Sequence, residues 1–130
     1  MNGSALKKIL LVEDDPDIRT VAQLSLETLG GFELCLAPSG QEALDLAPGF
    51  APDLFILDVM MPGLDGPGTL AGLRRVPALA ATPVIFMTAK VQPQEVAHLK
   101  SLGALEIISK PFDPMTLPDQ IRAVWERRHG

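Results

Sequence analysis

Five polar residues that could do chemistry follow short apolar runs in this 130-residue sequence. They are Glu13, Asp14, Asp58, Thr88 and Lys110. Carboxylate oxygens are hard ligands that suit Mg²⁺, and a bound divalent cation allows neighbouring carboxylates to stay ionised. Beside such a cation an aspartate oxygen can act as a nucleophile, while a hydroxyl and an ammonium group hold phosphoryl oxygens. The residue types therefore fit Mg²⁺-dependent phosphoryl transfer, provided that the fold brings them together.

The apolar runs that precede these residues have the length and composition of buried strands. Most of them lack polar alternation, which is typical of parallel-sheet strands with both faces covered. The five predicted strands are Ile9–Val12, Phe32–Ala37, Leu54–Leu57, Val84–Met87 and Ile107–Ile108. Strands that alternate with helices indicate right-handed crossovers. The predicted fold class is therefore α/β, a doubly wound five-stranded parallel sheet with five helices on its two faces.

The segments between the runs predict the five helices. The first, Pro16–Leu29, has apolar or small residues at helical spacing, namely Ile18, Val21, Ala22, Ser25 and Leu29. The others are Gln41–Ala47, stopped by Pro48 and Gly49, then Pro67–Arg75, Gln94–Leu102 and one within Pro114–Arg128 whose regular part begins at or near Pro118. In an open parallel sheet the ligand site lies beyond the carboxyl ends of the strands. We therefore expect the five polar residues to share one edge of the sheet.

Composition limits the classes to which the protein can belong. With 47% hydrophobic residues the chain suits one domain, predicted as 1–130 with tails at 1–6 and 129–130. The net charge of −5 argues against direct binding of nucleic acid. The single Cys35 has no partner for a disulfide within the chain, which indicates a reducing compartment, and no apolar run is long enough for a membrane span. We expect a cytoplasmic protein that does not enter the membrane.

Four sequence blocks contain the five polar residues and are spread along the chain from Ile9 to Phe112. In order they are "ILLVEDDPDIR", "DLFILDVMMPGLDG", "PVIFMTAK" and "IISKPF". Together they resemble the response-regulator receiver domain of bacterial two-component signalling, of the chemotaxis-regulator kind. The resemblance implies a flavodoxin-like three-layer sandwich with strand order 2-1-3-4-5.

On this resemblance each polar residue has an implied role. Asp58 would be the phosphoacceptor, Thr88 the switch hydroxyl and Lys110 the lysine of the site. The implied ligands of Mg²⁺, for which Mn²⁺ could substitute, are Glu13, Asp14, Asp58 and the main-chain carbonyl of Met60. The bond between Lys110 and Pro111 is expected to be cis, as it usually is in the family.

The resemblance also implies a function, a phosphorylation-controlled signalling switch. The phosphoryl group would come from a sensor histidine kinase or a histidine phosphotransfer protein. Phosphorylation would change partner binding through the surface of the fourth helix, fifth strand and fifth helix. The expected partners are a downstream effector protein or a fused output domain, with a phosphorylation-dependent homodimer as a further expectation. The protein would be a phosphoacceptor that assists its own phosphorylation and dephosphorylation, and would not be a multiple-turnover enzyme.

Ile107 motivates an alternative. It stands three residues before Lys110, where the family often has a Tyr or Phe that moves on phosphorylation. A constitutive docking or dimerisation scaffold, insensitive to phosphorylation, is therefore a second hypothesis. A small phosphatase with Asp58 as nucleophile is a third, although Val59 and Met60 follow Asp58 and supply no second acid.

Four further residues near these sites have structural interpretations. Asp15 is predicted to cap the first helix, and Asp17 lies in its first turn. Asp65 and Gly66 are predicted to set a turn and the start of the third helix.

Overall fold

Five parallel strands form one sheet in the order β2-β1-β3-β4-β5. The strands are β1 (Lys8–Val12), β2 (Glu33–Ala37), β3 (Leu54–Asp58), β4 (Val84–Thr88) and β5 (Glu106–Ser109). The structure is a computed structural model that describes residues 5–129. The predicted number of strands, their parallel arrangement and their order are confirmed.

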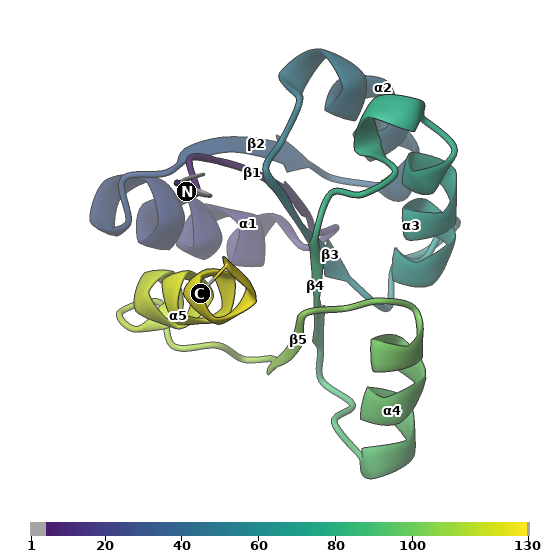
Figure 1. The fold of residues 1–130 in the computed structure, drawn as a ribbon. Helices are drawn as coiled ribbons and strands as arrows, with labels where there is room; N and C mark the ends of the chain where they lie inside the picture. Colours follow the sequence, from purple (N-terminus) through teal and green to yellow (C-terminus); the bar gives the residue numbers. More distant parts are fainter. Residues whose placement is uncertain (1–4, 130) are drawn as a thin grey trace.

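Helices cover both faces of the sheet and make the three-layer sandwich that was expected (Figure 1). On one face lie α1 (Pro16–Gln23), its π-helical continuation η1 (Leu24–Leu29) and α5 (Leu117–His129). On the other lie α2 (Gly40–Phe50), α3 (Gly66–Arg74) and α4 (Pro93–Ser101). A short 3-10 turn, η2 (Pro77–Leu79), joins α3 to β4. Within the described part of the chain, no helix is both long and apolar enough to cross a membrane.

Two apolar clusters, one on each face, form the core. Successive residues of a strand point to opposite faces, so Ile9 and Leu11 of β1 join the cluster under α1 and α5. Leu10 and Val12 join the cluster under α2, α3 and α4. Every residue of β3 and β4 is buried, because these strands are covered on both sides. Burial on both sides explains why the runs are almost wholly apolar.

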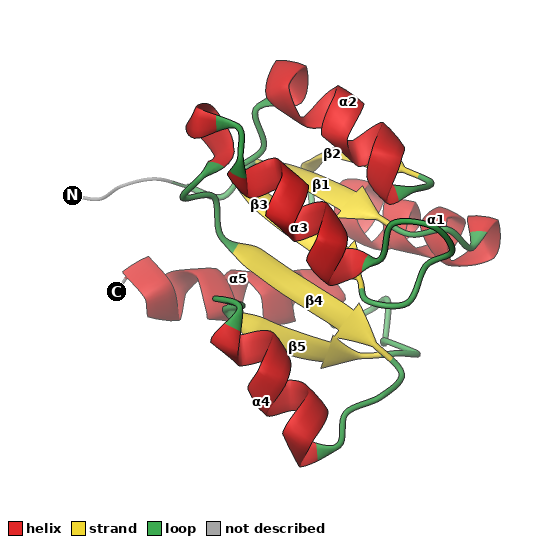
Figure 2. Ribbon diagram, turned by 90° about the vertical axis from the view of Figure 1, so that its right-hand side faces the viewer, coloured by secondary structure: helices red, strands yellow, loops and turns green. Residues whose placement is uncertain are grey.

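All five strands point the same way, so their carboxyl ends meet at one edge (Figure 2). The register pairs Val12 of β1 with Leu57 of β3, and Asp58 with Met87 of β4. The chain crosses to opposite faces after β1 and β3, which makes this edge the topological switch point where ligands bind in such sheets.

The first helix differs from the prediction in its last turns. It extends over Pro16–Leu29 as expected, but Leu24–Leu29 is π-helical, with the Gly30 N–H donating to the Ser25 carbonyl at 2.9 Å. The wider turn changes which residues face the core, so Leu26 is buried whereas Leu29 is 55% exposed. Placing Leu29 on the buried stripe was therefore wrong. Val21, which was placed on the same stripe, is also exposed, at 39%.

The second helix does not stop at Pro48, so the predicted end at Ala47 was wrong. α2 continues to Phe50, and Ala51 ends it in a left-handed conformation with φ 53°. Pro48 removes one backbone donor, but contacts from outside the helix hold the last turn. Phe50 packs on the core, and the ammonium group of Lys8 donates to its carbonyl at 3.2 Å.

The last helix begins near Pro118, as predicted. α5 starts at Leu117, and the Leu117 N–H donates to the Asp113 carbonyl at 2.9 Å, which gives the tight lead-in expected before Pro118. Of the predicted tails, residues 1–4 and 130 lie outside the described residues. Among the tail residues that the structure describes, Leu6 packs on the core, and His129 is the last residue of α5.

Candidate functional site

A loop of two acidic residues joins β1 to the cap of α1. The Glu13 N–H donates to the Ala37 carbonyl of β2 at 3.1 Å, which extends the edge of the sheet by one residue. Asp15 caps α1 as predicted, because its Oδ1 accepts from the N–H groups of Asp17 at 2.8 Å and Ile18 at 3.3 Å. Asp14 lies between these two fixed points.

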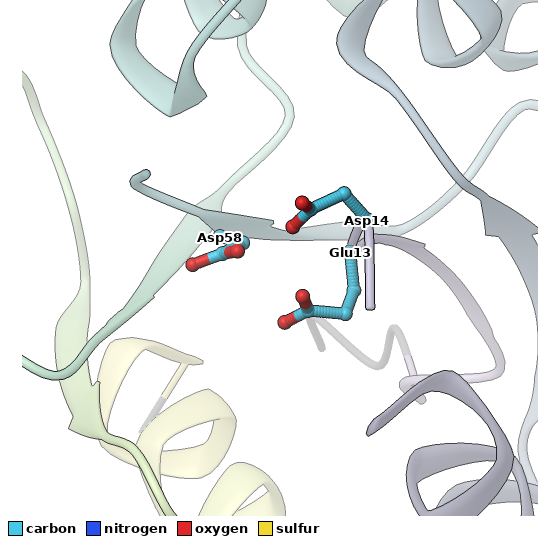
Figure 3. Close-up of side chains that lie close together, drawn as sticks. All are labelled: Glu13, Asp14 and Asp58. Atoms are coloured by element: carbon cyan, nitrogen blue, oxygen red, sulfur yellow. The ribbon is translucent and has the colours of Figure 1, made fainter. Parts of the chain in front are cut away.

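The side chains of Glu13, Asp14 and Asp58 come together at the switch point (Figure 3). One carboxylate oxygen from each lies within 4.8 Å of the others. Glu13 is 1% exposed and Asp58 3% exposed, and Asp58 is the last residue of the buried strand β3. Three converging carboxylates make a hard oxygen donor set, which fits a divalent cation such as Mg²⁺.

Lys110 reaches this cluster from the loop after β5. Its Nζ lies 2.9 Å from Glu13 Oε1 and 3.2 Å from Asp58 Oδ1. The Lys110 N–H donates to the Thr88 carbonyl at 2.9 Å, which fixes the backbone from which the side chain extends. The bond between Lys110 and Pro111 is cis, as expected from the resemblance.

Burial and neighbouring charge shift the pKa values of two of these groups. Burial, and then repulsion from Glu13, raise the pKa of Asp58 from 3.8 to about 6, although Lys110 acts in the opposite direction. Burial alone would lower the pKa of Lys110, but its contacts with Glu13 and Asp58 raise the pKa above its ordinary value. Lys110 is therefore a fixed positive charge, whereas Asp58 in the cation-free protein is a carboxylate that burial makes costly to ionise.

Thr88 ends β4 beside this cluster and is buried. Its hydroxyl oxygen accepts from the Lys90 N–H at 3.0 Å, and within residues 5–129 no acceptor is seen for the hydroxyl proton, which can therefore serve another acceptor. Thr88, Lys90 and Met60 also line a shared pocket of about 310 Å³ between α3 and α4. Met60 is 59% exposed, and the role of its carbonyl as a metal ligand stays a prediction.

Asp65 and Gly66 start α3 next to the end of β3, which is the structural role predicted for them. Asp65 caps α3 by accepting from the Gly68 N–H at 2.8 Å. A Cβ at position 66 would lie 2.6 Å from the carbonyl oxygen of Asp58 and 2.9 Å from Val59 Cα. Only glycine therefore lets α3 begin this close to the end of β3.

Arg19 is a residue of this region that the sequence analysis missed. Its Nη1 donates to the backbone carbonyls of Glu13 at 2.8 Å and Asp14 at 2.9 Å. The sequence does contain an indication of this role. An arginine one helical turn after the predicted cap Asp15 has a side chain long enough to reach the loop before the helix, where carbonyls belong to neither strand nor helix.

Comparison with known proteins agrees with this geometry. A family model described as the response regulator receiver domain matches residues 9–122. The transcriptional regulatory protein CseB of Streptomyces coelicolor is 39% identical over 119 residues, which cover 92% of this chain and 49% of that protein. The transcriptional regulatory protein CpxR of Escherichia coli is 39% identical over 124 residues, covering 95% of this chain and 51% of that protein. The chain thus spans about half the length of these curated relatives.

Solved structures give the same result for the fold. The chemotaxis protein CheY4 of Vibrio cholerae superposes with a TM-score of 0.84 at 32% identity, covering 92% of this chain and 99% of that chain. A putative response regulator from Chloroflexus aurantiacus superposes with a TM-score of 0.82 at 29% identity, covering 95% of this chain and 100% of that chain. The chain therefore belongs to the response regulator receiver domain family, whose members act in phosphorylation-dependent two-component signalling.

Proposed function

We propose that Asp58 accepts a phosphoryl group from the phosphohistidine of a sensor histidine kinase or a histidine phosphotransfer protein. The observation that carries this proposal is the constellation around Asp58. Its carboxylate lies within 4.8 Å of oxygens from Glu13 and Asp14, and its Oδ1 lies 3.2 Å from the ammonium group of Lys110. A buried carboxylate with this surplus of negative charge is suited to a cation and, beside it, to a phosphoryl group.

The transfer exchanges one bond to phosphorus for another. An oxygen of the ionised Asp58 carboxylate attacks phosphorus, and a P–O bond forms as the P–N bond to the donor imidazole breaks. The imidazole nitrogen keeps the electron pair of that bond and can then take up a proton. Asp58 supplies the nucleophile, and Lys110 supplies a positive charge in contact with it.

The residues that would hold Mg²⁺ are Glu13, Asp14 and Asp58 through their carboxylates and Met60 through its carbonyl. Mn²⁺ could substitute, because it also prefers oxygen ligands. When bound, the cation supplies positive charge that offsets the carboxylates and the phosphoryl oxygens. Fixed strand ends and the capped helix hold these ligands in place, so the chain can bind the cation without large rearrangement.

Thr88 and Lys110 would transmit phosphorylation to the surface. The acyl phosphate carries roughly −1.5 to −2 charges beside Lys110, where the carboxylate carried −1, and it offers acceptors to the Thr88 hydroxyl. Because the Lys90 N–H is bonded to that hydroxyl, a movement of Thr88 pulls on the loop that leads into α4. We therefore expect the surface of α4, β5 and α5 to change and to bind or release a partner.

The partners follow from the lengths and names of the relatives. CseB and CpxR are transcriptional regulatory proteins about twice as long as the matched region. We infer a downstream effector protein or a fused output domain for this receiver domain, with a phosphorylation-dependent homodimer as a further candidate. The net charge of −5 favours an output through protein contacts over direct nucleic-acid binding by residues 1–130.

Intact-mass measurement tests the proposal. The protein is incubated with Mg²⁺ and acetyl phosphate, and the wild type should gain the mass of one phosphoryl group. Asp58→Asn should gain none, and excess EDTA should stop the gain in the wild type. Absence of the gain in the wild type, or an equal gain in the variant, would refute the assignment of Asp58. Partner binding that stays the same with and without beryllofluoride would instead support the constitutive scaffold suggested by Ile107, which family membership does not favour.

A further inference from the structure

We infer that Arg19 is a positioning residue that holds the loop between β1 and α1 in the shape required for cation binding. The inference rests on the proposed function, because it concerns the cation held by Glu13 and Asp14. Arg19 belongs to α1 and would not contact the cation itself. It would act through the backbone of the two residues that carry ligands.

A single side-chain nitrogen makes the contacts. Arg19 Nη1 donates to the carbonyl of Glu13 at 2.8 Å and to the carbonyl of Asp14 at 2.9 Å. Both carbonyls lie outside regular structure, since β1 ends at Val12 and the first carbonyl that accepts inside the helix is that of Asp15. The Arg19 N–H donates to that Asp15 carbonyl at 3.0 Å, so the helix fixes the residue whose side chain reaches back to the loop.

Other contacts restrain the loop on either side of Asp14. The backbone of Glu13 is tied to β2, and Glu13 Oε2 accepts from the Asp15 N–H at 3.1 Å. For Asp14, the hydrogen bond seen in the described part of the chain is the one its carbonyl accepts from Arg19. Lys110 forms ion pairs with Glu13 and Asp58, and neither of these involves Asp14. The orientation of Asp14 toward Asp58 therefore depends on Arg19 more than that of the other two acids.

This arrangement predicts an effect on cation affinity. The carboxylates of Glu13, Asp14 and Asp58 repel one another. Without a cation, turning Asp14 away from the other two would reduce this repulsion and lower the free energy of the loop. Two bonds to successive carbonyls restrict rotation of both peptide groups and keep the ligands preorganised. Removing contacts that orient metal ligands typically weakens metal affinity by about 10- to 100-fold, and we expect about tenfold for a restraint on the backbone.

Charge has the opposite effect and has to be separated from position. Loss of the Arg19 charge would by itself strengthen the binding of a cation, although salt at about 0.15 M weakens such effects beyond roughly 8 Å. Arg19→Met removes both the charge and the bonds, whereas Arg19→Lys keeps the charge and loses the planar fork. If charge dominated, Arg19→Met would bind the cation more tightly than the wild type.

Arg74 offers a matched control at the other end of the sheet. Its Nη1 also donates to two backbone carbonyls, those of Leu79 at 3.1 Å and Thr82 at 2.6 Å. These carbonyls belong to the connection that precedes β4, far from the strand ends that carry the site. Arg74→Met therefore removes the same kind of restraint without touching the ligand loop.

Mn²⁺ titration followed by EPR measures the affinity directly, with Mg²⁺ as competitor and circular dichroism to verify folding. Arg19→Met should bind about tenfold more weakly than the wild type, Arg19→Lys should lie between them, and Arg74→Met should match the wild type. Phosphorylation of Arg19→Met by acetyl phosphate should be slow at low Mg²⁺ and recover at saturating Mg²⁺.

Unchanged or tighter binding by Arg19→Met would overturn the inference, as would an equal loss in Arg74→Met. If Arg19→Met fails to fold, the comparison of Arg19→Lys with the wild type decides, and equal affinities would refute the role of the fork. Absence of cation binding in the wild type would instead refute the proposed function. The two failures can therefore be told apart.

Discussion

Replacing Asp58 by asparagine should stabilise the cation-free protein at neutral pH. The carboxylate of Asp58 is buried at the end of β3 and close to Glu13, and these two causes raise its pKa from 3.8 to about 6 in spite of Lys110. Asparagine has nearly the same shape and carries no charge. Its Oδ1 can still accept from Lys110, whose ion pair with Glu13 at 2.9 Å is unaffected.

The size of the effect follows from the pKa. A rise from 3.8 to about 6 means that ionising Asp58 costs about 3 kcal/mol more in the folded protein than in the unfolded chain. The penalty is absent below pH 3.8, grows between pH 3.8 and about 6, and is complete above that range. Asp58→Asn should therefore be more stable than the wild type by up to about 3 kcal/mol at pH 8, and by much less at pH 4.5.

Urea unfolding in EDTA at pH 8 and pH 4.5 measures this difference. Asp53→Asn serves as the control, because the Asp53 carboxylate accepts from the N–H groups of Lys7 and Lys8 outside the site and its replacement should not stabilise the protein. Added Mg²⁺ should raise the stability of the wild type more than that of Asp58→Asn. A variant no more stable than the wild type at pH 8, or an equal gain at both pH values, would refute the electrostatic reasoning.

Three further predictions test separate parts of the structure. Asp15→Ala should lower stability in urea by about 1 kcal/mol through loss of the helix cap and retain Mg²⁺-dependent phosphorylation, whereas Asp14→Ala should abolish that phosphorylation in intact-mass measurements. Gly66→Ala should lower the free energy of unfolding by about 1 to 3 kcal/mol, because its Cβ would clash with the Asp58 carbonyl; a stability equal to the wild type would contradict this packing. Ser25→Ala should cost about 1 kcal/mol, since the buried hydroxyl donates at 2.6 Å to a carbonyl before α5, and calorimetric melting would detect the loss.

Much of the fold could be predicted because the amino-acid composition of each strand reflects how far it is buried. β3 and β4 are covered on both faces and are therefore apolar up to their last residue. That last residue is Asp58 in one strand and Thr88 in the other, so the same signal locates both the strand end and the site. The position of Lys110 near the end of β5 follows from the same reasoning.

The features that sequence reasoning missed depend on distant contacts. Proline usually stops a helix, yet α2 passes Pro48 because Phe50 packs on the core and Lys8 of β1 holds its carbonyl. The exposure of Leu29 follows from a π turn for which side-chain periodicity gives no signal. Arg19 binds backbone carbonyls, which every residue has, so its position one turn after the predicted cap Asp15 is the signal, and the types of its partners add none.

The three consecutive acids after β1 have three different environments, and their charges explain why the site needs a cation. Asp15 caps α1, and Glu13 forms an ion pair with Lys110. Asp14 faces Asp58 and forms no ion pair with any described residue. The carboxylates of Glu13, Asp14 and Asp58 and the ammonium group of Lys110 together carry a net charge of about −2, which one divalent ion neutralises.

In the proposed reaction this balance is lost again, because the aspartyl phosphate carries more negative charge than the carboxylate it replaces. The surplus must be met by donors that are near and still free to donate. The buried hydroxyl of Thr88 meets both conditions, since its oxygen accepts from the Lys90 N–H and its proton has no acceptor among the residues that the structure describes. The negative charge of the modified site can thus attract the Thr88 hydroxyl. Because Lys90 is bonded to that hydroxyl, the loop that leads to α4 would move with it. On this argument Thr88→Ala should still accept the phosphoryl group in the intact-mass assay but lose the change in partner binding, whereas a Thr88→Ala protein that switches normally would show that the signal leaves the site by another route.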